Sequence, residues 1–449
     1  MVLKGKVLVI GCSLSGLAAA DLLLKSGYAV YVTEYGKLNE KYADDVSRLK
    51  SQGVRFEFEG HTKDFMQHSD FAVTSPSVPT NALVFKLLKE EGIKVYSELD
   101  LAYNFATNKD SFIGITGTNG KSTTTSAVDF FLSRKFKAPA CGNIGLPPTS
   151  LVLSAPDFFV TEVSSFQLEQ SSTFKSHIAC WTNFTPDHIT WHGSLDAYFD
   201  AKAKLFLNQT ENDYAILNGA DDALMNLVQR CKAKVFVFDK EVEDNCAFIK
   251  DGSIFVKVNG CLEKVVALSE CQLSGHHNYQ NLMCAILISV LAGLSMDDIR
   301  DGVKNFKAPE HRMEKFAEYK GITFYNDSKA TNPESSIAAI NAFSDKMVLI
   351  AGGRDKLTSL KEFCESVKEH VAATILIGEA AERFNKELLN NGYTNIYFES
   401  SLMSAVDKAI ELNPDSILLS PACASFDMFT GYEERGKVFK EYVLSKISK

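Results

Sequence analysis

A short loop with two glycines, at residues 117 to 123, carries the clearest chemistry in this sequence. It follows the apolar run Phe112–Thr116 and reads Gly117-Thr118-Asn119-Gly120-Lys121-Ser122-Thr123. In loops of this kind backbone N–H groups surround phosphate oxygens, the lysine reaches the β- and γ-phosphates, and the serine hydroxyl ligates Mg²⁺. Ile115 stands where the strict pattern G-x-x-x-x-G-K-[ST] has its first glycine, so this is a shorter variant. The loop predicts ATP binding, with Lys121 stabilising charge during phosphoryl transfer.

Two polar positions after later apolar runs offer ligands for the metal ion that accompanies ATP. Glu162 lies at the end of the run Phe158–Val163, and Asp187-His188 follows the run Ile178–Asn183. Mg²⁺ prefers hard oxygen ligands around a triphosphate. Because the carboxyl ends of parallel strands meet at one edge of a sheet, we expect these groups near the phosphate loop.

A second turn, from Gly11 to Gly16, follows the strand-like run Val7–Ile10. It resembles the dinucleotide-binding pattern G-x-G-x-x-G with Ser13 in place of the second glycine, and Glu34 stands about 20 residues on, where an acid that binds ribose would lie. Three interpretations stay open at this point. The turn could bind NAD in an oxidoreductase, it could hold a nucleotide or its sugar with the diphosphate at the helix N-terminus, or it could be a corner without a ligand.

The elements that must position these residues form an alternating pattern. Short apolar runs alternate with helix-like stretches along nearly the whole chain, which predicts an α/β protein with mostly parallel sheets. Near residues 235–266 apolar residues alternate around Asp251-Gly252 and Asn259-Gly260, which predicts β-hairpins. The predicted buried strands are Val7–Ile10, Ala29–Thr33, Phe71–Thr74, Phe112–Thr116, Phe158–Val163, Ile178–Asn183, Ala215–Asn218, Met347–Ala351, Thr374–Gly378 and Ser416–Ser420.

Length and composition narrow the class of protein. A chain of 449 residues is too long for one hydrophobic core. The polar segments Tyr103–Ser111 and Lys307–Arg312 are predicted linkers, and the expected domains are 1–106, 107–310 and 311–449. A formal net charge of −9 argues against a nucleic-acid partner. Ten cysteines without a C-x-x-C pair indicate reduced thiols in the cytoplasm.

Targeting and membrane segments are not expected. The N-terminus lacks the basic, apolar and small-residue regions of a signal peptide. The longest apolar stretch, Leu282–Leu294, is interrupted by Ser289 and Gly293 and is shorter than the ~20 residues of a membrane span. We therefore predict that this stretch is a buried helix and that the protein has no membrane partner.

Together the motifs resemble the Mur ligase family, whose members join an amino acid to the carboxylate of a nucleotide-linked sugar. The matching residues run in order through the whole chain. They are the phosphate loop, Glu162 with Ser164-Ser165, Asp187-His188, Gly275-His276-His277-Asn278 with Asn281, and His311-Arg312. The resemblance implies three domains: a Rossmann-like N-terminal domain for the UDP-sugar substrate, a central P-loop ATPase-type α/β domain, and a Rossmann-like C-terminal domain for the amino acid.

Three further stretches resemble the family members that add D-glutamate to UDP-N-acetylmuramoyl-L-alanine. The most discriminating is Asn326–Pro333, and the others are Gly142–Gly145 and Leu419–Asp427. The resemblance implies a cytoplasmic ligase of peptidoglycan-precursor synthesis that uses ATP and Mg²⁺ and proceeds through an acyl phosphate. Two alternatives stay open: another amide ligase such as a folylpolyglutamate synthase, which differs at Asn326–Pro333, and a phosphate-loop GTPase or ATPase switch.

The resemblance also implies roles for single residues. The implied catalytic residues are Lys121, Glu162, His188 and Lys202, and the implied metal ligands are Ser122, Glu162, His188 and a carbamylated Lys202. Beyond the phosphate loop, the implied ATP contacts are Asn278, Asn281, Arg312 and Asp327. The implied UDP-substrate contacts are Ser13, Leu14, Ser15, Glu34, Asn143 and His188. The implied D-glutamate contacts are Thr331, Lys356, Ser425 and Phe426. Carbamylation needs a neutral amine, so a lowered pKa of Lys202 is expected.

The last third of the chain fits an acidic amino acid. Pro333 after Asn332 predicts a capped helix start. Tyr432 stands where the family usually has phenylalanine, which leaves its role open. Cations for two carboxylates are offered by Lys329, Arg354 and Lys356.

Overall fold

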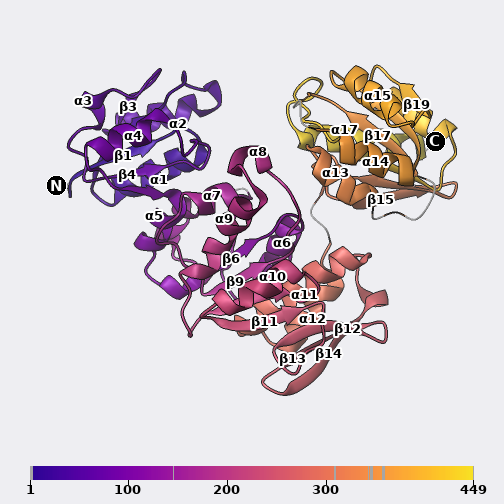
Figure 1. The fold of residues 1–449 in the computed structure, drawn as a ribbon, viewed down its shortest axis with the longest axis horizontal. Coiled ribbons are helices and arrows are strands. Elements are labelled where there is room, and N and C mark those ends of the chain that lie inside the picture. The colour runs from indigo at the N-terminus through magenta and orange to yellow at the C-terminus, as the bar shows by residue number, and fades with distance from the viewer. Residues whose placement is uncertain are drawn as a thin grey trace. The chain divides into compact units, whose positions relative to one another are not determined.

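The computed structural model describes residues 4–144, 146–307, 310–341, 343, 347–355 and 359–447. The chain divides into two compact units, Met1–Phe306 and Lys307–Lys449. Strands and helices alternate in both units, and the sheets are mainly parallel, so the prediction of an α/β protein is confirmed (Figure 1). The boundaries expected for three domains stay predictions.

A five-stranded parallel sheet begins the first unit, in the order β3-β2-β1-β4-β5. Its central strand β1 alternates between two cores, because Val7 and Val9 pack into one hydrophobic cluster and Leu8 and Ile10 into another. Burial on both faces explains why this strand is a continuous apolar run. The strands are β1 (Lys6–Ile10), β2 (Ala29–Thr33), β3 (Arg55–Glu57), β4 (Phe71–Thr74) and β5 (Val95–Ser97), and the helices are α1 (Leu14–Lys25), α2 (Ala43–Ser51), α3 (Lys63–Met66), α4 (Leu83–Glu90) and α5 (Glu98–Phe105).

A nine-stranded sheet forms the rest of the first unit, in the order β14-β13-β12-β11-β10-β9-β6-β8-β7. The predicted hairpins are confirmed, because β12, β13 and β14 pair antiparallel and Asp251 and Gly252 both have the positive φ of a tight turn. The strands are β6 (Phe112–Thr116), β7 (Ala140–Gly142), β8 (Phe159–Glu162), β9 (Ile178–Trp181), β10 (Tyr214–Asn218), β11 (Lys234–Phe238), β12 (Cys246–Lys250), β13 (Ser253–Val258) and β14 (Cys261–Ala267).

The helices of this sheet include the buried helix expected from the apolar stretch. Residues 282–289 of α11 are all buried, and α11 packs against α6. Among the described residues no helix is both long and apolar enough to cross a membrane. The helices are α6 (Lys121–Leu132), α7 (Ser165–Glu169), α8 (Ile189–His192), α9 (Leu195–Leu207), α10 (Asp222–Leu227), α11 (His276–Leu291) and α12 (Met296–Asn305).

The second unit holds a six-stranded sheet in the order β15-β16-β20-β17-β18-β19, parallel except for the β15–β16 pair. Pro333 is the first residue of α13, and the Asn332 side chain accepts a hydrogen bond from Ser335 N, so the predicted cap is confirmed. The strands are β15 (Glu314–Tyr319), β16 (Ile322–Asn326), β17 (Met347–Gly352), β18 (Val371–Ile377), β19 (Ile396–Phe398) and β20 (Ser416–Leu419), and the helices are α13 (Pro333–Ile340), α14 (Lys361–His370), α15 (Ala381–Asn390), α16 (Leu402–Glu411) and α17 (Tyr432–Ile447).

Two buried carboxylates on α5 join the two sheets of the first unit. Asp100 accepts hydrogen bonds from the backbone N–H groups of Thr173 and Phe174, both at 2.7 Å. Glu98 accepts from the N–H and the hydroxyl of Thr149, at 2.8 and 2.6 Å.

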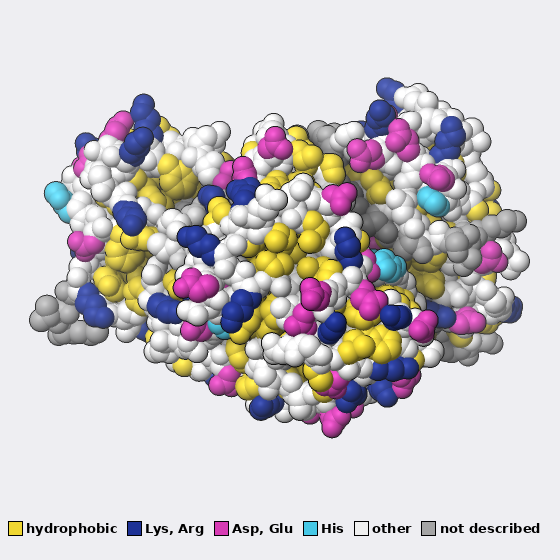
Figure 2. Space-filling model, turned by 60° about the horizontal axis from the view of Figure 1, so that its bottom comes forward, with side chains coloured by type: hydrophobic (Ala, Val, Ile, Leu, Met, Phe, Trp, Pro, Cys, Tyr) yellow, Lys and Arg dark blue, Asp and Glu magenta, His cyan; other side chains and the backbone are white. Residues whose placement is uncertain are grey.

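On the face drawn in Figure 2, acidic and basic side chains are interspersed, so neither sign of charge dominates that face.

Glu98 should make stability depend on pH. Burial raises the pKa of its carboxyl from 4.5 to about 7. The unfolded chain therefore releases this proton at lower pH than the folded chain, and stability falls as pH rises from about 4.5 to about 7. We expect Glu98→Gln to remove this loss, which is on the order of 3 kcal/mol at pH 8, and to matter little at pH 4. Urea unfolding at both pH values measures it, with the exposed Glu90→Gln as control; equal pH slopes in wild type and Glu98→Gln would contradict the assignment.

Candidate active site

The phosphate loop needs glycine at two positions for steric reasons. A Cβ atom at Gly117 would lie 1.9 Å from Thr182 Oγ1, and one at Gly120 would lie 2.2 Å from Asn281 Oδ1. Both glycines also have positive φ, 151° and 80°. Backbone alone fits here, as a loop that closely surrounds phosphate requires. The predicted loop is present although its first consensus glycine is Ile115, which lies in β6.

The segment after β9 fixes the shape of this loop. Thr118 N donates to Asn183 O at 3.0 Å, and Asn119 N donates to Asn183 Oδ1 at 2.9 Å. Thr182 Oγ1 donates to Asn119 O at 2.6 Å. Sequence reasoning did not identify this support, because Thr182 and Asn183 carry no motif of their own.

Two lysines meet at one carbonyl oxygen of the loop. Lys121 Nζ lies 2.9 Å from Gly117 O and 2.7 Å from Thr118 O, and Lys202 Nζ lies 2.7 Å from the same Gly117 oxygen. Lys202 is only 2% exposed, and its ammonium lies 4.9 Å from the centre of the Tyr198 ring. Burial first, and then the charge of Lys121, hold the pKa of Lys202 well below its usual value. The lowered pKa expected for a lysine that becomes carbamylated is therefore found.

Glu162 ends the strand next to the loop strand, with Ile115 of β6 paired to Glu162 of β8. The side chain of Glu162 is buried, and Asn143 Nδ2 donates to its Oε1 at 2.8 Å. Asn143 N also donates to Glu162 O at 2.8 Å. Asn143, which the family resemblance assigns to the UDP-substrate, thus also orients this carboxylate. Glu162 is the last residue of β8, and Asn143 directly follows the edge strand β7. The spacing of these residues in the sequence does not predict the contact.

His188 is the N-cap residue of α8, in the segment that follows β9. Its backbone has a positive φ of 53°, and its Nε2 lies 3.2 Å from Asp187 Oδ2. Burial lowers the pKa of His188, and the positive charges of Lys121 and Lys202 lower it further, although the carboxylate of Asp187 acts to raise it. A neutral imidazole can ligate a metal.

Trp191 of the same helix is half-buried, and its Nε1 donates to Glu169 Oε2 at 2.8 Å.

The donors around the loop fit the predicted metal ion. The Ser122 hydroxyl and the Glu162 carboxylate are hard oxygen ligands of the kind that Mg²⁺ prefers. Ser122 is the second residue of α6, whose N-cap is Gly120. A carbamate on Lys202 would add a further oxygen ligand. These residues therefore fit Mg²⁺ beside a bound phosphate chain.

Two of the residues expected to contact ATP, Asn278 and Asn281, lie near the start of α11. Asn281 is buried against the phosphate loop, and its Oδ1 accepts from Thr124 Oγ1 at 3.3 Å. Asn278 Nδ2 donates to Ser274 O at 2.8 Å. Of the two adjacent histidines, His276 pairs with Asp239 at 2.8 Å, and burial lowers the pKa of His277.

The N-terminal turn is closed by Glu34. Its Oε2 accepts from Cys12 N at 2.8 Å and its Oε1 accepts from Gly36 N at 3.0 Å. The bond from Cys12 stabilises the turn that carries Ser13, Leu14 and Ser15. The Leu14 side chain is half exposed at the start of α1. Glu34 and the turn are brought together as expected, whereas the contact of Glu34 with a ribose stays a prediction.

The remaining predicted contacts lie in the second unit. Burial raises the pKa of Asp327 to about 7, although Ser420 Oγ donates to its Oδ2 at 2.7 Å. Arg354 lies 3.2 Å from Glu379, and Lys329 Nζ lies 5.3 Å from the centre of the Tyr432 ring. Lys356 and Gly145 lie outside the described residues. This unit also contains Arg312, Thr331, Ser425 and Phe426, of which Ser425 is buried and Phe426 exposed.

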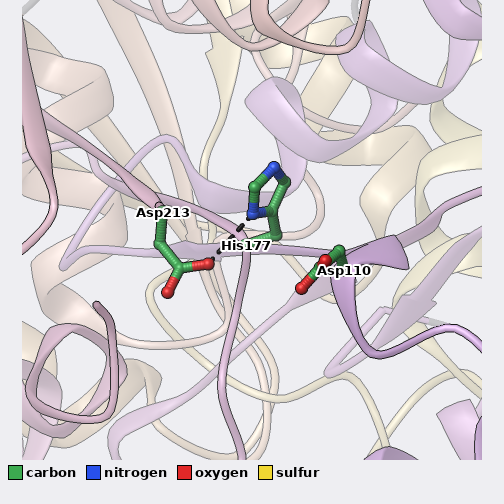
Figure 3. Close-up of side chains that lie close together, drawn as sticks. All are labelled: Asp110, His177 and Asp213. Atoms are coloured by element: carbon green, nitrogen blue, oxygen red, sulfur yellow. Dashed lines mark hydrogen bonds and ion pairs between the residues drawn. The ribbon is translucent and has the colours of Figure 1, made fainter. Parts of the chain in front are cut away.

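A separate cluster of Asp110, His177 and Asp213 lies where β6, β9 and β10 begin, at the opposite edge of the sheet. His177 Nδ1 points to Asp213 at 2.9 Å (Figure 3). Lys175 Nζ lies 3.0 Å from Asp213 and 3.5 Å from Asp110. Because the lysine already supplies positive charge to both carboxylates, the cluster is explained as an ion-pair network.

Sequence comparison places this site in a known family. A model of the Mur ligase middle domain matches residues 115–289, and a model of the Mur ligase glutamate ligase domain matches residues 311–423. The chain is 42% identical to the UDP-N-acetylmuramoylalanine–D-glutamate ligase of Thermoanaerobacter pseudethanolicus, with 99% of each chain covered. It is 35% identical to the ligase of the same name from Clostridioides difficile, again with 99% of each chain covered.

Solved structures share the fold at lower identity. MurF from Acinetobacter baumannii matches with a TM-score of 0.60 and 17% identity, over 96% of this chain and 93% of that one. MurF from Thermotoga maritima, solved in complex with ADP, matches with a TM-score of 0.58 and 18% identity, over 99% and 96%. The resemblance drawn from the motifs is thus confirmed along the whole length of the sequence, and the chain belongs to the Mur ligase family.

Proposed function

We propose that this protein is an ATP-dependent ligase that joins D-glutamate to UDP-N-acetylmuramoyl-L-alanine in the cytoplasmic synthesis of peptidoglycan precursors. The observation that carries the proposal is the phosphate loop with Lys121, next to the buried carboxylate of Glu162, in a chain 42% identical to a UDP-N-acetylmuramoylalanine–D-glutamate ligase over nearly its whole length. A phosphate loop alone would fit a nucleotide-hydrolysing switch equally well. The relatives of matching length favour the ligase.

The reaction has two steps. In the first, Lys121 stabilises negative charge while the γ-phosphoryl group of ATP passes to the substrate carboxylate, giving an acyl phosphate and ADP. In the second, the amine of D-glutamate attacks the acyl carbon, and the tetrahedral intermediate loses phosphate while the nitrogen loses a proton. When bound, Mg²⁺ would neutralise charge on the phosphates. Its proposed ligands are Ser122, Glu162, His188 and carbamylated Lys202.

Three ligands are assigned to residues of the chain. We assign the adenine, ribose or γ-phosphate of ATP to Asn278, Asn281, Arg312 and Asp327. The UDP-sugar is assigned to Ser13, Leu14, Ser15, Glu34, Asn143 and His188, and D-glutamate to Thr331, Lys356, Ser425 and Phe426. These assignments rest on the family resemblance, and Lys356 lies outside the described residues.

Lys202 should carry a carbamate. Lys121 and Lys202 share the Gly117 carbonyl, and the neutral Lys202 amine can react with CO₂ to give a carbamate and release a proton, which places a negative charge beside the Lys121 ammonium. We expect the protein in ¹³C-bicarbonate to show a carbamate carbon signal by NMR that Lys202→Arg loses. Lys204→Arg, on the same helix with its Nζ bonded to Glu169 O, is the matched control and should keep the signal. An unchanged signal in Lys202→Arg would rule out this site.

Omission of single substrates tests the function. ADP release in the presence of ATP and Mg²⁺ should require both UDP-N-acetylmuramoyl-L-alanine and D-glutamate, and mass spectrometry should detect their amide. ADP release without either co-substrate would identify a nucleotide-hydrolysing switch. ADP release with a folate and glutamate would identify a folylpolyglutamate synthase. Either result would overturn the proposal.

A further inference from the structure

Arg435 is a buried cation in the second unit to which the motifs assign no role. It lies in the first turn of α17 and is 1% exposed. Its Nε donates to Ser328 Oγ at 2.9 Å and its Nη2 to Ser328 O at 2.8 Å. Its Nη1 donates to Cys423 O at 3.1 Å and to Ala424 O at 3.4 Å. One guanidinium thus binds two separate loops.

These two loops follow neighbouring strands of one sheet. The loop of Ser328 follows β16 and the loop of Ala424 follows β20, and the two strands are paired in parallel with Asn326 opposite Leu419. Sites in α/β proteins form at such strand ends. The first loop leads to Thr331 and the second to Ser425 and Phe426, the residues assigned to D-glutamate. Arg435 therefore connects the two sides of the proposed amino-acid site from beneath.

The bonds of Arg435 also set the direction of a peptide group. The carbonyl of Ala424 points to the guanidinium and also accepts from Arg354 N at 2.8 Å. In a planar trans peptide the N–H points opposite to the C=O, so the N–H of Ser425 points away from Arg435. Within the described part of the chain, Ser425 N donates to no other residue. This buried N–H therefore has no acceptor among the described residues and can donate to a ligand.

The charge of Arg435 is not cancelled by a bound carboxylate. All four of its hydrogen bonds among the described residues go to neutral oxygens. Burial lowers the pKa of Arg435 to about 10, while the carboxylates of Asp427 and Asp327 attract it only through space, so the group stays cationic at neutral pH. A buried cation beneath two loops favours a ligand with negative charge above them.

We infer that Arg435 is a positioning residue for D-glutamate: it holds the Ser328 loop and the Ser425 loop at one spacing and turns the Ser425 N–H toward a carboxylate of the amino acid. The inference rests on the proposed function. It assigns Arg435 no contact with the substrate, since Nε, Nη1 and Nη2 each donate to one of the two loops and the side chain is buried.

Steady-state kinetics of Arg435→Lys tests this role. Lysine keeps the positive charge but cannot bridge both loops with a planar fork. We expect KM for D-glutamate to rise roughly tenfold or more, as when a charge-assisted hydrogen bond is lost, while KM for ATP and for the UDP-substrate changes less than about twofold. The matched control is Lys437→Met on the same helix, whose side chain is 71% exposed and should leave all three constants unchanged.

A second variant covers the case that Arg435→Lys does not fold. Ser328→Ala keeps Arg435 and removes only the hydroxyl that accepts from Nε and donates to Tyr432 O. We expect a smaller rise of the D-glutamate KM, roughly threefold to tenfold, again without a change for ATP. An unchanged D-glutamate KM, or equal rises for all three substrates, would overturn the role of Arg435. Wild-type ADP release that ignores D-glutamate would instead overturn the proposed function.

Discussion

Replacing Lys121 by alanine should abolish measurable turnover while the protein stays folded. The Lys121 ammonium lies over the carbonyls of Gly117 and Thr118, in the loop whose glycines admit no side chain. Removal of one such charge-stabilising donor costs a rate factor of roughly 10²–10³. Gly117 O keeps the hydrogen bond from Lys202, so only Thr118 O loses a donor and stability should fall by about 1–3 kcal/mol.

The measurement is ADP release with both co-substrates, together with far-UV circular dichroism and a thermal melt. Lys135→Ala is the matched control, because Lys135 follows the same helix and its Nζ bonds only to Gly293 O. The control should keep full activity. A Lys121→Ala protein with wild-type, ATP-dependent turnover would refute the assignment of the loop.

Replacing Asp100 by asparagine should cause the largest loss of stability. Its Oδ1 accepts from Thr173 N and Phe174 N, and its Oδ2 accepts from Ser97 N and Ser172 N, both at 3.0 Å. An amide presents a donor where one of these oxygens stood, so at least two buried N–H groups lose their acceptor. At about 1–3 kcal/mol for each, we expect the free energy of unfolding to fall by roughly 2–5 kcal/mol.

The pH dependence of this loss has a definite sign. Burial raises the pKa of Asp100, but the hydrogen bonds from Thr173, Ser171, Ser97 and Ser172 outweigh it, so the folded pKa lies below the unfolded value of 3.8. The contribution of the carboxylate is complete above that value and is lost as pH falls through the folded pKa. Urea unfolding at pH 7 and at successively lower pH values below 3.8 measures it. The control Asp297→Asn, at a side chain 95% exposed, should change stability by less than about 0.5 kcal/mol.

The sequence predicted the central strands because burial on both faces leaves a continuous apolar run. β2, β4 and β6 have the expected bounds, and β1 differs by a single residue. The short strands β3, β5, β7 and β19 were not predicted, since three residues show no periodicity. Each of them is the outermost strand at one edge of its sheet. These strands form by hydrogen bonding to the neighbouring strand, and their amino-acid composition does not indicate them.

The candidate site was predictable where a motif carries it and not where a distant contact does. The phosphate loop, Glu162 and Lys202 stand in recognisable stretches, and the structure brings the loop, Glu162 and Lys202 to one sheet edge. Arg435 and Asn143 act through residues up to 107 positions away in the chain. Only the folded chain reveals such pairs, because neither partner needs a special neighbour in the sequence.

The position of Trp191 on α8 gives the protein an optical reporter of its own. The chain has two tryptophans. Trp181 is fully buried at the end of β9, whereas Trp191 is 38% exposed and lies three residues after His188. Solvent-dependent emission must therefore come mainly from Trp191. If metal binds at the proposed ligand His188, we expect intrinsic fluorescence to report the binding without a label and without turnover.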